Sequence, residues 1–426
     1  MIKPSIPIMC LALATSAMAA PAPPPNPMAG KSVSELHAIL KKSDAPEMDR
    51  ANAALALAEF VSPPNEAGGK KKGRKAKNAP EWVLKIPEGF IDAAATGLAD
   101  RAGSVRFYSG HALALAGADA VPTLIKAAGS ANADEKISAI HAIGMTAGKM
   151  SGSKKGGTPA DLAPVFASAV PVLQKALKDD NYIVRETACA TFSRLGTVGA
   201  LALDDLIALL DDAEFCVVNR AVHAVAAADP GGSKSVLALV EALESEHEVR
   251  EFIVKELGRM GQAAKDAVPA LCALVGEDKN SWQVALAATS ALLNIVTYGE
   301  KPAEDLMVAE RNQALRAIGE AMANQDARFL QARIRNTVLD HKGYGPVGAE
   351  SEPLVDFLEQ TLRDWAVTEK GYFGPPLPRL CEVLAEIGKD YKTAHLVALA
   401  KELKAAEDTQ DVWRTEFEPI LNLESK

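Results

Sequence analysis

Aromatic side chains are scarce in this sequence, and several other features of common binding proteins are missing from it. Phe, Trp and Tyr together make up 5% of the residues, which argues against a large aromatic ligand cage. After the first 19 residues there is no apolar run of the roughly 20 residues that a membrane-spanning helix needs. A net charge of −9 gives no overall positive field to recruit nucleic acid or anionic membranes. We therefore expect neither a nucleic-acid partner nor a transmembrane segment.

Motifs of catalysis are also missing. His247 and Glu248 begin a zinc-protease motif, but Glu251 stands where its second histidine is required. The sequence has no C-x-x-C and no G-x-S-x-G turn. Gly30-Lys31-Ser32 resembles the end of a phosphate loop, yet Pro25 replaces the earlier glycine. We expect no catalytic residues, no metal and no cofactor.

Cysteine is rare, and its spacing indicates no disulfide framework. Cys10 falls in the N-terminal segment, and the other four are Cys189, Cys216, Cys272 and Cys381. Because these four lie on different predicted helices, we expect small buried apolar residues. A bridge between Cys189 and Cys216 is the alternative.

The sequence does contain a recurring motif. A Val-Arg pair is followed by a glycine at a fixed spacing, first from Val105 to Gly117 and again from Val184 to Gly196. The same motif occurs once more near residue 250. We call the Arg position slot 0 and number the following positions from it. Slot 0 falls on Arg106, Lys136, Arg185, Val218, Arg250 and Ala285. Repetition at about 33 residues predicts an array of small helical units.

Each unit reads as two helices. Small or apolar residues recur at slots 3, 6, 7 and 10, which is helical spacing. Upstream, the motif A-V-P-x-L places Pro122, Pro171 and Pro269 where a helix begins, and proline is tolerated in a first turn. Neither helix can bury its apolar stripe alone, so neighbouring units must stack into one continuous core.

These motifs resemble the HEAT repeats, in particular the short bacterial kind of phycobilisome-lyase-like arrays. The matching pattern is A-V-P-x-L, an acidic turn, and V-R-x-x-A-x-x-A-L, with Ala169 to Gly196 as the closest copy. The resemblance covers about residues 103 to 296. It implies an all-α fold, a right-handed α-solenoid of antiparallel helix pairs, and it implies no single activity.

The ends of the chain differ from the array. Lys3, an apolar run and a small-residue Ala17-Met18-Ala19 site predict that residues 1–19 are a signal peptide, so we expect export to the periplasm or the extracellular space. We interpret residues 20–32 as a Pro-rich tether and residues 33–296 as the repeat array. Residues 297–426 read as degenerate helical repeats ending in an irregular cap.

Loops interrupt the array at residues 63–80 and 149–160. The first carries a Lys-rich stretch at 68–78, which is either a solvated extension or a contact for an anionic partner. Two similar loops around Tyr344 and Tyr372 either cap the core or contact a ligand.

Candidate binding residues follow from the helical phase. Slot 5 points away from the core slots at about 100° per residue, and it carries three histidines. Exposed apolar residues at slot 1 accompany two of them, and clustered exposed apolar groups mark interaction surfaces. The candidate set is Phe107, His111, Ile137, His141, His223, Lys255 and Arg259. Ordinary packing and a two-histidine metal site are the alternatives for this set.

The sequence therefore predicts a non-catalytic, exported scaffold that binds a partner protein along the concave face of a HEAT-like solenoid. A HEAT-like lyase or metal-dependent enzyme is one alternative. An envelope spacer with a purely structural role is the other.

Overall fold

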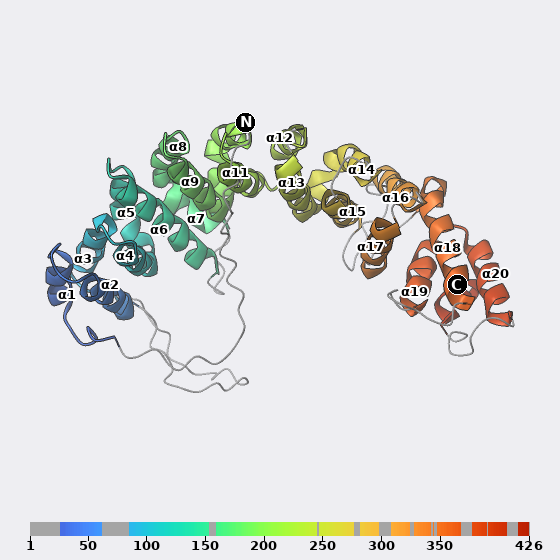
Figure 1. Ribbon diagram of the computed structural model, residues 1–426, viewed down its shortest axis with the longest axis horizontal. Coiled ribbons are helices and arrows are strands. Elements are labelled where there is room, and N and C mark those ends of the chain that lie inside the picture. Colours follow the sequence, from blue (N-terminus) through green and yellow to red (C-terminus); the bar gives the residue numbers. More distant parts are fainter. Residues whose placement is uncertain are drawn as a thin grey trace, which may run out of the picture.

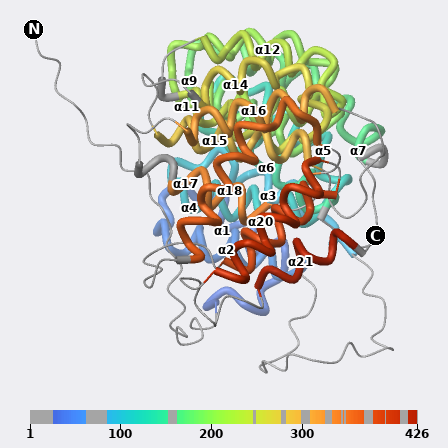
Figure 2. The backbone as a smooth tube through the Cα atoms, turned by 90° about the vertical axis from the view of Figure 1, so that its right-hand side faces the viewer, coloured from blue at the N-terminus to red at the C-terminus, as the bar shows by residue number. Residues whose placement is uncertain are grey.

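The chain forms a curved array of helix pairs in a computed structural model (Figures 1 and 2). The structure describes residues 26–61, 85–152, 159–244, 247–276, 282–297, 308–323, 328–341, 344, 347–367, 377–389, 391–406 and 416–425. Within these residues there is no strand. The predicted all-α solenoid is confirmed.

Each pair has a first and a second helix. The first helices are α1 (Val33–Leu40), α3 (Phe90–Thr96), α5 (Val121–Ala128), α8 (Val170–Leu177), α10 (Leu203–Ala208), α12 (Ser235–Ala242), α14 (Val268–Gly276), α16 (Val308–Ala323), α18 (Glu352–Val367) and α20 (Thr393–Ala405). The second helices are α2 (Glu47–Val61), α4 (Gly103–Ala116), α6 (Ala133–Gly152), α9 (Tyr182–Leu195), α11 (Phe215–Ala228), α13 (His247–Met260), α15 (Trp282–Val296), α17 (Arg328–Asp340) and α19 (Leu377–Gly388). Two further helices are α7 (Pro159–Phe166) and α21 (Glu418–Leu421).

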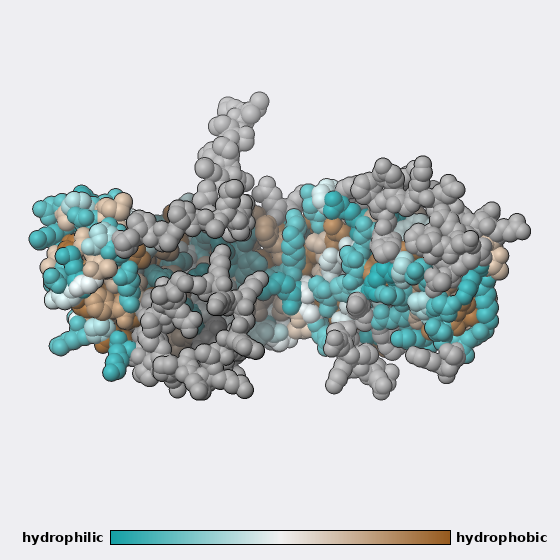
Figure 3. Space-filling view, turned by 90° about the horizontal axis from the view of Figure 1, so that it is seen from below, coloured by the Kyte–Doolittle hydropathy of each residue, from teal (hydrophilic) through white to brown (hydrophobic). Residues whose placement is uncertain are grey.

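The second helices pack on one another along the array, from α2 to α19. Figure 1 shows an arc in which α13, α15 and α17 lie on the inner side and α12, α14 and α16 on the outer side. The second helices therefore line the concave face, which Figure 3 shows as a mixture of hydrophilic and hydrophobic side chains.

The signals read from the sequence mark the helix ends. Pro122 and Pro171 lie in the first turns of α5 and α8. After the second helices α4, α9 and α13, the recurring glycine has a positive φ: 69° at Gly117, 59° at Gly196 and 57° at Gly261. Glycine adopts this backbone conformation without the steric cost of a Cβ atom. The glycine lets the chain leave each second helix and start the next unit.

The predicted loop at 149–160 is partly wrong. Helix α6 continues to Gly152, and α7 begins at Pro159. Met150 packs against the core at the end of α6, and Phe166 of α7 is fully buried. Apolar contacts on both sides therefore extend the helices into the predicted loop.

In the N-terminal half of the array, Arg50 of α2 and the slot-0 cations of α4, α6 and α9 each join one unit to the next. The ion pairs along this ladder are Arg50–Asp100 (2.7 Å), Arg106–Asp134 (3.3 Å), Lys136–Asp179 (2.6 Å) and Arg185–Asp212 (2.8 Å). The carboxylate lies just before the following second helix at Asp100, Asp179 and Asp212, and in its first turn at Asp134. Asp212 also accepts the backbone N–H of Glu214 at 2.9 Å, so the same carboxylate holds the turn before α11. We call this row of pairs the ladder.

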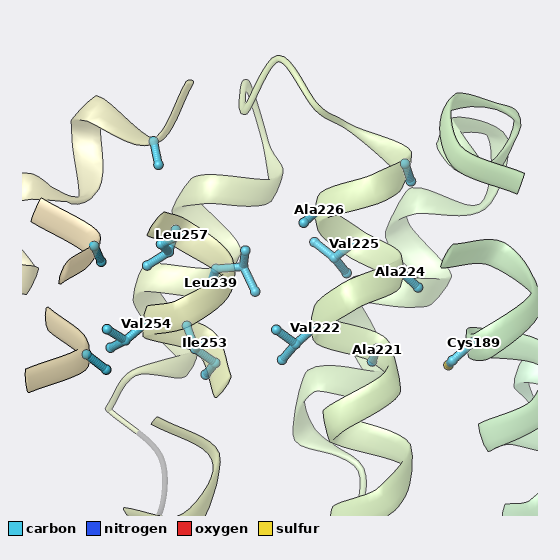
Figure 4. Packing of buried hydrophobic residues seen from close by; sticks show 14 of the residues in the cluster. Cys189, Ala221, Val222, Ala224, Val225, Ala226, Leu239, Ile253, Val254 and Leu257 are labelled. Atoms are coloured by element: carbon cyan, nitrogen blue, oxygen red, sulfur yellow. The ribbon is translucent and has the colours of Figure 1, made fainter. Parts of the chain in front are cut away.

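The ladder is interrupted at α11, where slot 0 is Val218. The side chain of Val218 is buried, and packing of apolar side chains joins α11 to its neighbours (Figure 4). Val222 faces Ile253 of α13, while Ala221 faces Cys189 of α9. Burial of these side chains stabilises the junction at about 25 cal/mol per Å² of apolar surface removed from water.

Several predicted features lie outside the described residues. These are the signal peptide at 1–19, the insertion at 63–80 with its Lys-rich stretch at 68–78, and Tyr372.

Candidate functional site

The seven candidate residues all lie on second helices, in two groups. Phe107 and His111 belong to α4, and Ile137 and His141 belong to α6. His223 on α11 and Lys255 and Arg259 on α13 form the other group. The structure thus places every candidate in the helix layer of the concave face, with α9 between the two groups.

The first group is less exposed than its phase predicted. Phe107 is 54% exposed, and its ring meets the edge of Tyr108 with 5.6 Å between centroids. Ile137, however, is half-buried and packs against the core, so the expectation that it is exposed is wrong. Each second helix packs against two neighbours, and the buried arc is therefore wider than slots 3, 6, 7 and 10 suggest.

The two histidines of the first group lie in a positive environment. Burial, followed by the charge of Lys149, lowers the pKa of His111 below its ordinary value of 6.5. Burial, followed by the charge of Arg194, lowers the pKa of His141. Both imidazoles are therefore neutral at neutral pH. In the described part of the chain, Arg194 forms no ion pair, so this stretch of the concave face keeps an uncompensated cation.

The second group is built around a buried carboxylate that the sequence reasoning missed. Glu256 on α13 occupies slot 6 and is 5% exposed, while the same slot holds alanine in α4, α6, α11 and α15. Its Oε2 lies 2.7 Å from Nδ1 of His223 and 2.8 Å from Nη1 of Arg259. A buried charge needs such partners because desolvation is otherwise very costly. A glutamate in a slot otherwise filled by alanine was the sequence signal that could have revealed this cluster.

Two hollows open on either side of this cluster. One has a cavity volume of about 550 Å³ and lies between α13 and α15. Its lining includes Lys255, Gly258, Arg259, Trp282, Leu286 and Ser290. The other has a volume of about 530 Å³, and its lining includes Ser193, Arg220, His223, Ala227, Glu256 and Arg259. Arg259 belongs to both hollows and separates them.

The walls of these hollows are fixed by specific contacts. At Gly258 a Cβ atom would lie 2.8 Å from Cα of Ala291, so only glycine allows α13 and α15 to approach this closely. Trp282 packs under the guanidinium of Arg333 at 5.0 Å from the ring centroid, a cation–π contact. Lys255 pairs with Glu251 at 2.5 Å. The concave face is therefore preformed here, with one mainly apolar hollow and one more polar hollow.

The four cysteines outside the N-terminal segment are free thiols. Cys189 and Cys381 are buried, which raises the pKa of each thiol to about 12. The alternative of a bridge between Cys189 and Cys216 is therefore wrong. Neither buried thiol is a reactive thiolate at neutral pH.

Tyr344 is a core residue in the structure. Its side chain is fully buried, its hydroxyl donates to the carbonyl of Val338, and its N–H donates to Glu386 at 2.8 Å. These contacts leave no face of the ring for a ligand.

Neither a membrane-spanning helix nor a metal-binding group occurs within the described ranges. No helix there is long and apolar enough to cross a membrane. No group of three or more His, Cys, Asp or Glu side chains there is placed to hold a metal ion.

The fold and the concave surface together define the class of the protein, an α-solenoid of stacked helix pairs. A family model described as HEAT-like repeat matches residues 155–195, which include α8 and α9. The chain thus carries a HEAT-like repeat, and the predicted resemblance is confirmed.

Three solved structures are similar to parts or most of the chain. An engineered protein is 18% identical, with 92% of this chain and 99% of that chain covered and a TM-score of 0.45. Importin beta is 13% identical, with coverages of 92% and 57% and a TM-score of 0.43. Human deoxyhypusine hydroxylase in complex with glycerol is 19% identical, with coverages of 72% and 94% and a TM-score of 0.26. No curated protein sequence matches the chain.

Proposed function

We propose that the protein binds a partner protein along its concave face and acts by this contact rather than by catalysis. The observation that carries the proposal is the pair of hollows that meet at Arg259. Together they offer about 550 and 530 Å³ of open space on neighbouring second helices. Interfaces of stable complexes depend on a few pockets that accept large side chains of the partner.

The chemistry of the hollows supports a protein partner. The hollow between α13 and α15 is mainly apolar around Leu286 and suits aliphatic or aromatic side chains, whereas the other hollow is more polar. The two linings include Arg220, Lys255 and Arg259. Arginine and aromatic groups are enriched where proteins bind one another. The exposed ring of Phe107 extends the proposed surface toward α4, as does Arg194, which is exposed and forms no ion pair with any residue that the structure describes.

The N-terminal segment bears on where the protein acts. We propose that the chain is exported and meets its partner in the periplasm or outside the cell. The positively charged start, apolar run and small-residue site in residues 1–19 support this.

A side chain that fills one hollow tests the proposal. Ser290 lines the hollow between α13 and α15 and is half-buried, so Ser290→Tyr should occupy the space without entering the core. Ala273→Tyr is the matched control, since Ala273 is exposed on α14 in the outer layer. Both variants and the unchanged chain are used to capture partners from the envelope fraction of the native organism.

We expect a defined set of captured proteins that the control retains and Ser290→Tyr loses at least about tenfold, as for a central interface position. Equal capture by both variants would refute binding at the hollows. If the unchanged chain captures nothing above an unrelated solenoid, the role of a spacer is favoured instead.

A further inference from the structure

A strip of exposed aromatic side chains lies on one edge of the array, where second helices begin. Tyr182 is the first residue of α9 and Phe215 is the first residue of α11, and each is 42% exposed. Helices α9 and α11 pack side by side, so the two rings lie along the same edge. Ile183 beside Tyr182 is 40% exposed.

The strip continues onto a third unit. The ring of Phe215 meets Phe252 of α13 in an edge-to-face arrangement, with 5.9 Å between the centroids and 66° between the planes. We call Tyr182, Ile183, Phe215 and Phe252 the edge strip. None of its members lines the hollows at Arg259. The edge strip is therefore a second surface, independent of the proposed binding face.

Packing does not explain the edge strip. The first residue of the equivalent helices varies: α4 begins with Gly103 and α6 with Ala133, whereas α15 begins with Trp282, whose ring packs against Arg333. The fold therefore does not require an aromatic residue at this position. Exposed apolar groups that cluster across units are unusual on a monomer and mark contact surfaces.

Exposed carboxylates lie close to the edge strip in the sequence. The turns before α9 and α11 carry Asp180, Asp211 and Glu214, which are exposed and form no ion pair with any part of the chain that the structure describes. The cations nearby are already engaged, since Arg185 pairs with Asp212 and Arg220 with a carboxylate of α9. The local charge is therefore negative.

The negative charge is also seen in its effect on a neighbouring thiol. Burial, together with the charges of Glu186 and Glu214, raises the pKa of Cys216. An anionic lipid surface or a nucleic acid would be repelled by this field. A second copy of the chain would bring the same carboxylates and the same net charge of −9.

We propose that the edge strip binds a segment of a partner protein that alternates basic and apolar side chains. The apolar side chains would cover Ile183 and Phe252. The basic groups would lie over the faces of Tyr182 and Phe215, where cation–π attraction adds to that of the free carboxylates.

The test uses the full chain and fluorescein-labelled synthetic peptides, with binding followed by anisotropy at several salt concentrations. The probe is a twelve-residue peptide of alternating arginine and leucine. The peptides in which glutamate replaces arginine, or serine replaces leucine, are its counterparts. Two double variants are compared. The aromatic variant is Tyr182→Ser with Phe215→Ser, and the carboxylate variant is Asp211→Asn with Glu214→Gln.

Matched controls lie on α12 and in the turn that follows it, in the outer layer. Leu237 is 63% exposed, so Leu237→Ser removes an apolar surface group elsewhere. Glu241→Gln with Glu244→Gln removes the same charge as the carboxylate variant, from two exposed positions. Because all these side chains are exposed, circular dichroism melting should confirm that every variant folds.

We expect the arginine–leucine peptide to bind the unchanged chain and both controls equally within about twofold. The aromatic variant should bind it at least about tenfold more weakly, since stacked aromatic contacts dominate such sites. The carboxylate variant should bind several-fold more weakly and with a smaller salt dependence.

Four results would overturn the proposal. Equal binding by the aromatic variant and Leu237→Ser would mean that overall charge alone holds the peptide. Binding of the glutamate peptide, or no binding at all, would contradict the stated chemistry. A dimer in sedimentation that Phe215→Ser dissolves would show that a second copy covers the strip. None of these results depends on whether Ser290→Tyr changes capture at the hollows.

Discussion

Removal of one partner of a ladder pair should destabilise the array locally, and Arg185–Asp212 is the pair best suited to measure this. Arg185 donates to both carboxylate oxygens of Asp212, at 2.8 Å each. It also donates to the carbonyl of Asp179 at 2.9 Å, so the guanidinium holds two consecutive turns. The perturbation is a double-mutant cycle of Arg185→Ala and Asp212→Ala.

The expected magnitude follows from exposure. The side chain of Asp212 is 6% exposed and that of Arg185 is 16% exposed. Removing one partner of a fully buried pair costs about 3–5 kcal/mol, because an uncompensated charge remains. Since Arg185 keeps backbone acceptors and some solvent contact, we expect about 2–3 kcal/mol for Asp212→Ala. We expect a coupling energy of at least about 1.5 kcal/mol.

The sign of the pH dependence gives a second readout. Although burial alone raises the pKa of Asp212, hydrogen bonds from Arg185 and Glu214 and the charge of Arg185 outweigh it and lower the pKa. The stabilisation is therefore present above the ordinary value of 3.8 and is lost as the pH falls through the lower folded value.

The assay is urea denaturation near pH 7, combined with hydrogen exchange of α9 and α11, because long repeat arrays do not unfold as one unit. Lys401–Glu424 is the control pair, with exposures of 55% and 60%, and its coupling should stay below about 0.5 kcal/mol. A coupling for Arg185–Asp212 no larger than that of the control would refute the reasoning.

Further predictions concern the core, the histidines and the metal content. Glu256→Ala gives slot 6 the alanine of other units, so it should lower the free energy of unfolding by less than about 1 kcal/mol in urea denaturation. His223→Ala leaves the buried carboxylate short of a partner and should lower it by about 2–3 kcal/mol. The reverse order would contradict the account of this cluster. Because the pKa of His141 is lowered in the folded chain, the fold is most stable with a neutral imidazole, well above pH 6.5, and loses stability as the pH drops through 6.5. His141→Gln should therefore flatten the fall in Tm between about pH 7.5 and 5.5. An unchanged slope would argue against a neutral imidazole. We expect plasma emission analysis of the purified protein to find no stoichiometric metal and its absorption spectrum to show no cofactor band, and a bound transition metal would favour the enzymatic alternative.

Much of the architecture could be predicted from the sequence because its signals are local. A period of about 3.6 residues, a proline in the first turn and a glycine at the end act within one helix, and each is read without knowledge of its neighbours. The ladder was harder. Arg185 was visible as a mark of the repeat, but its partner Asp212 is identified only once the turns of adjacent units lie side by side.

The candidate site was predicted only in outline for the same reason. The phase of a single helix placed Ile137 outside, yet slot 4 is also fully buried, as Ile140 and Val222 show, and the buried arc reaches further round the helix. Glu256 was missed because a charged residue at a core slot contradicts the pattern unless His223 of the preceding unit is known to be close. Contacts between units decide these positions.

The buried Glu256 makes the repeats of this array non-interchangeable. Units of similar length suggest that one could be cut out or exchanged for another by simple splicing, as in consensus designs of repeat proteins. Removing the unit of α10 and α11 would place α13 against α9, where Ala190 occupies the slot that His223 holds in α11. The carboxylate would then keep only Arg259. A shortened chain would thus need Glu256 replaced by alanine at the new seam, which gives the order of the units a chemical cause.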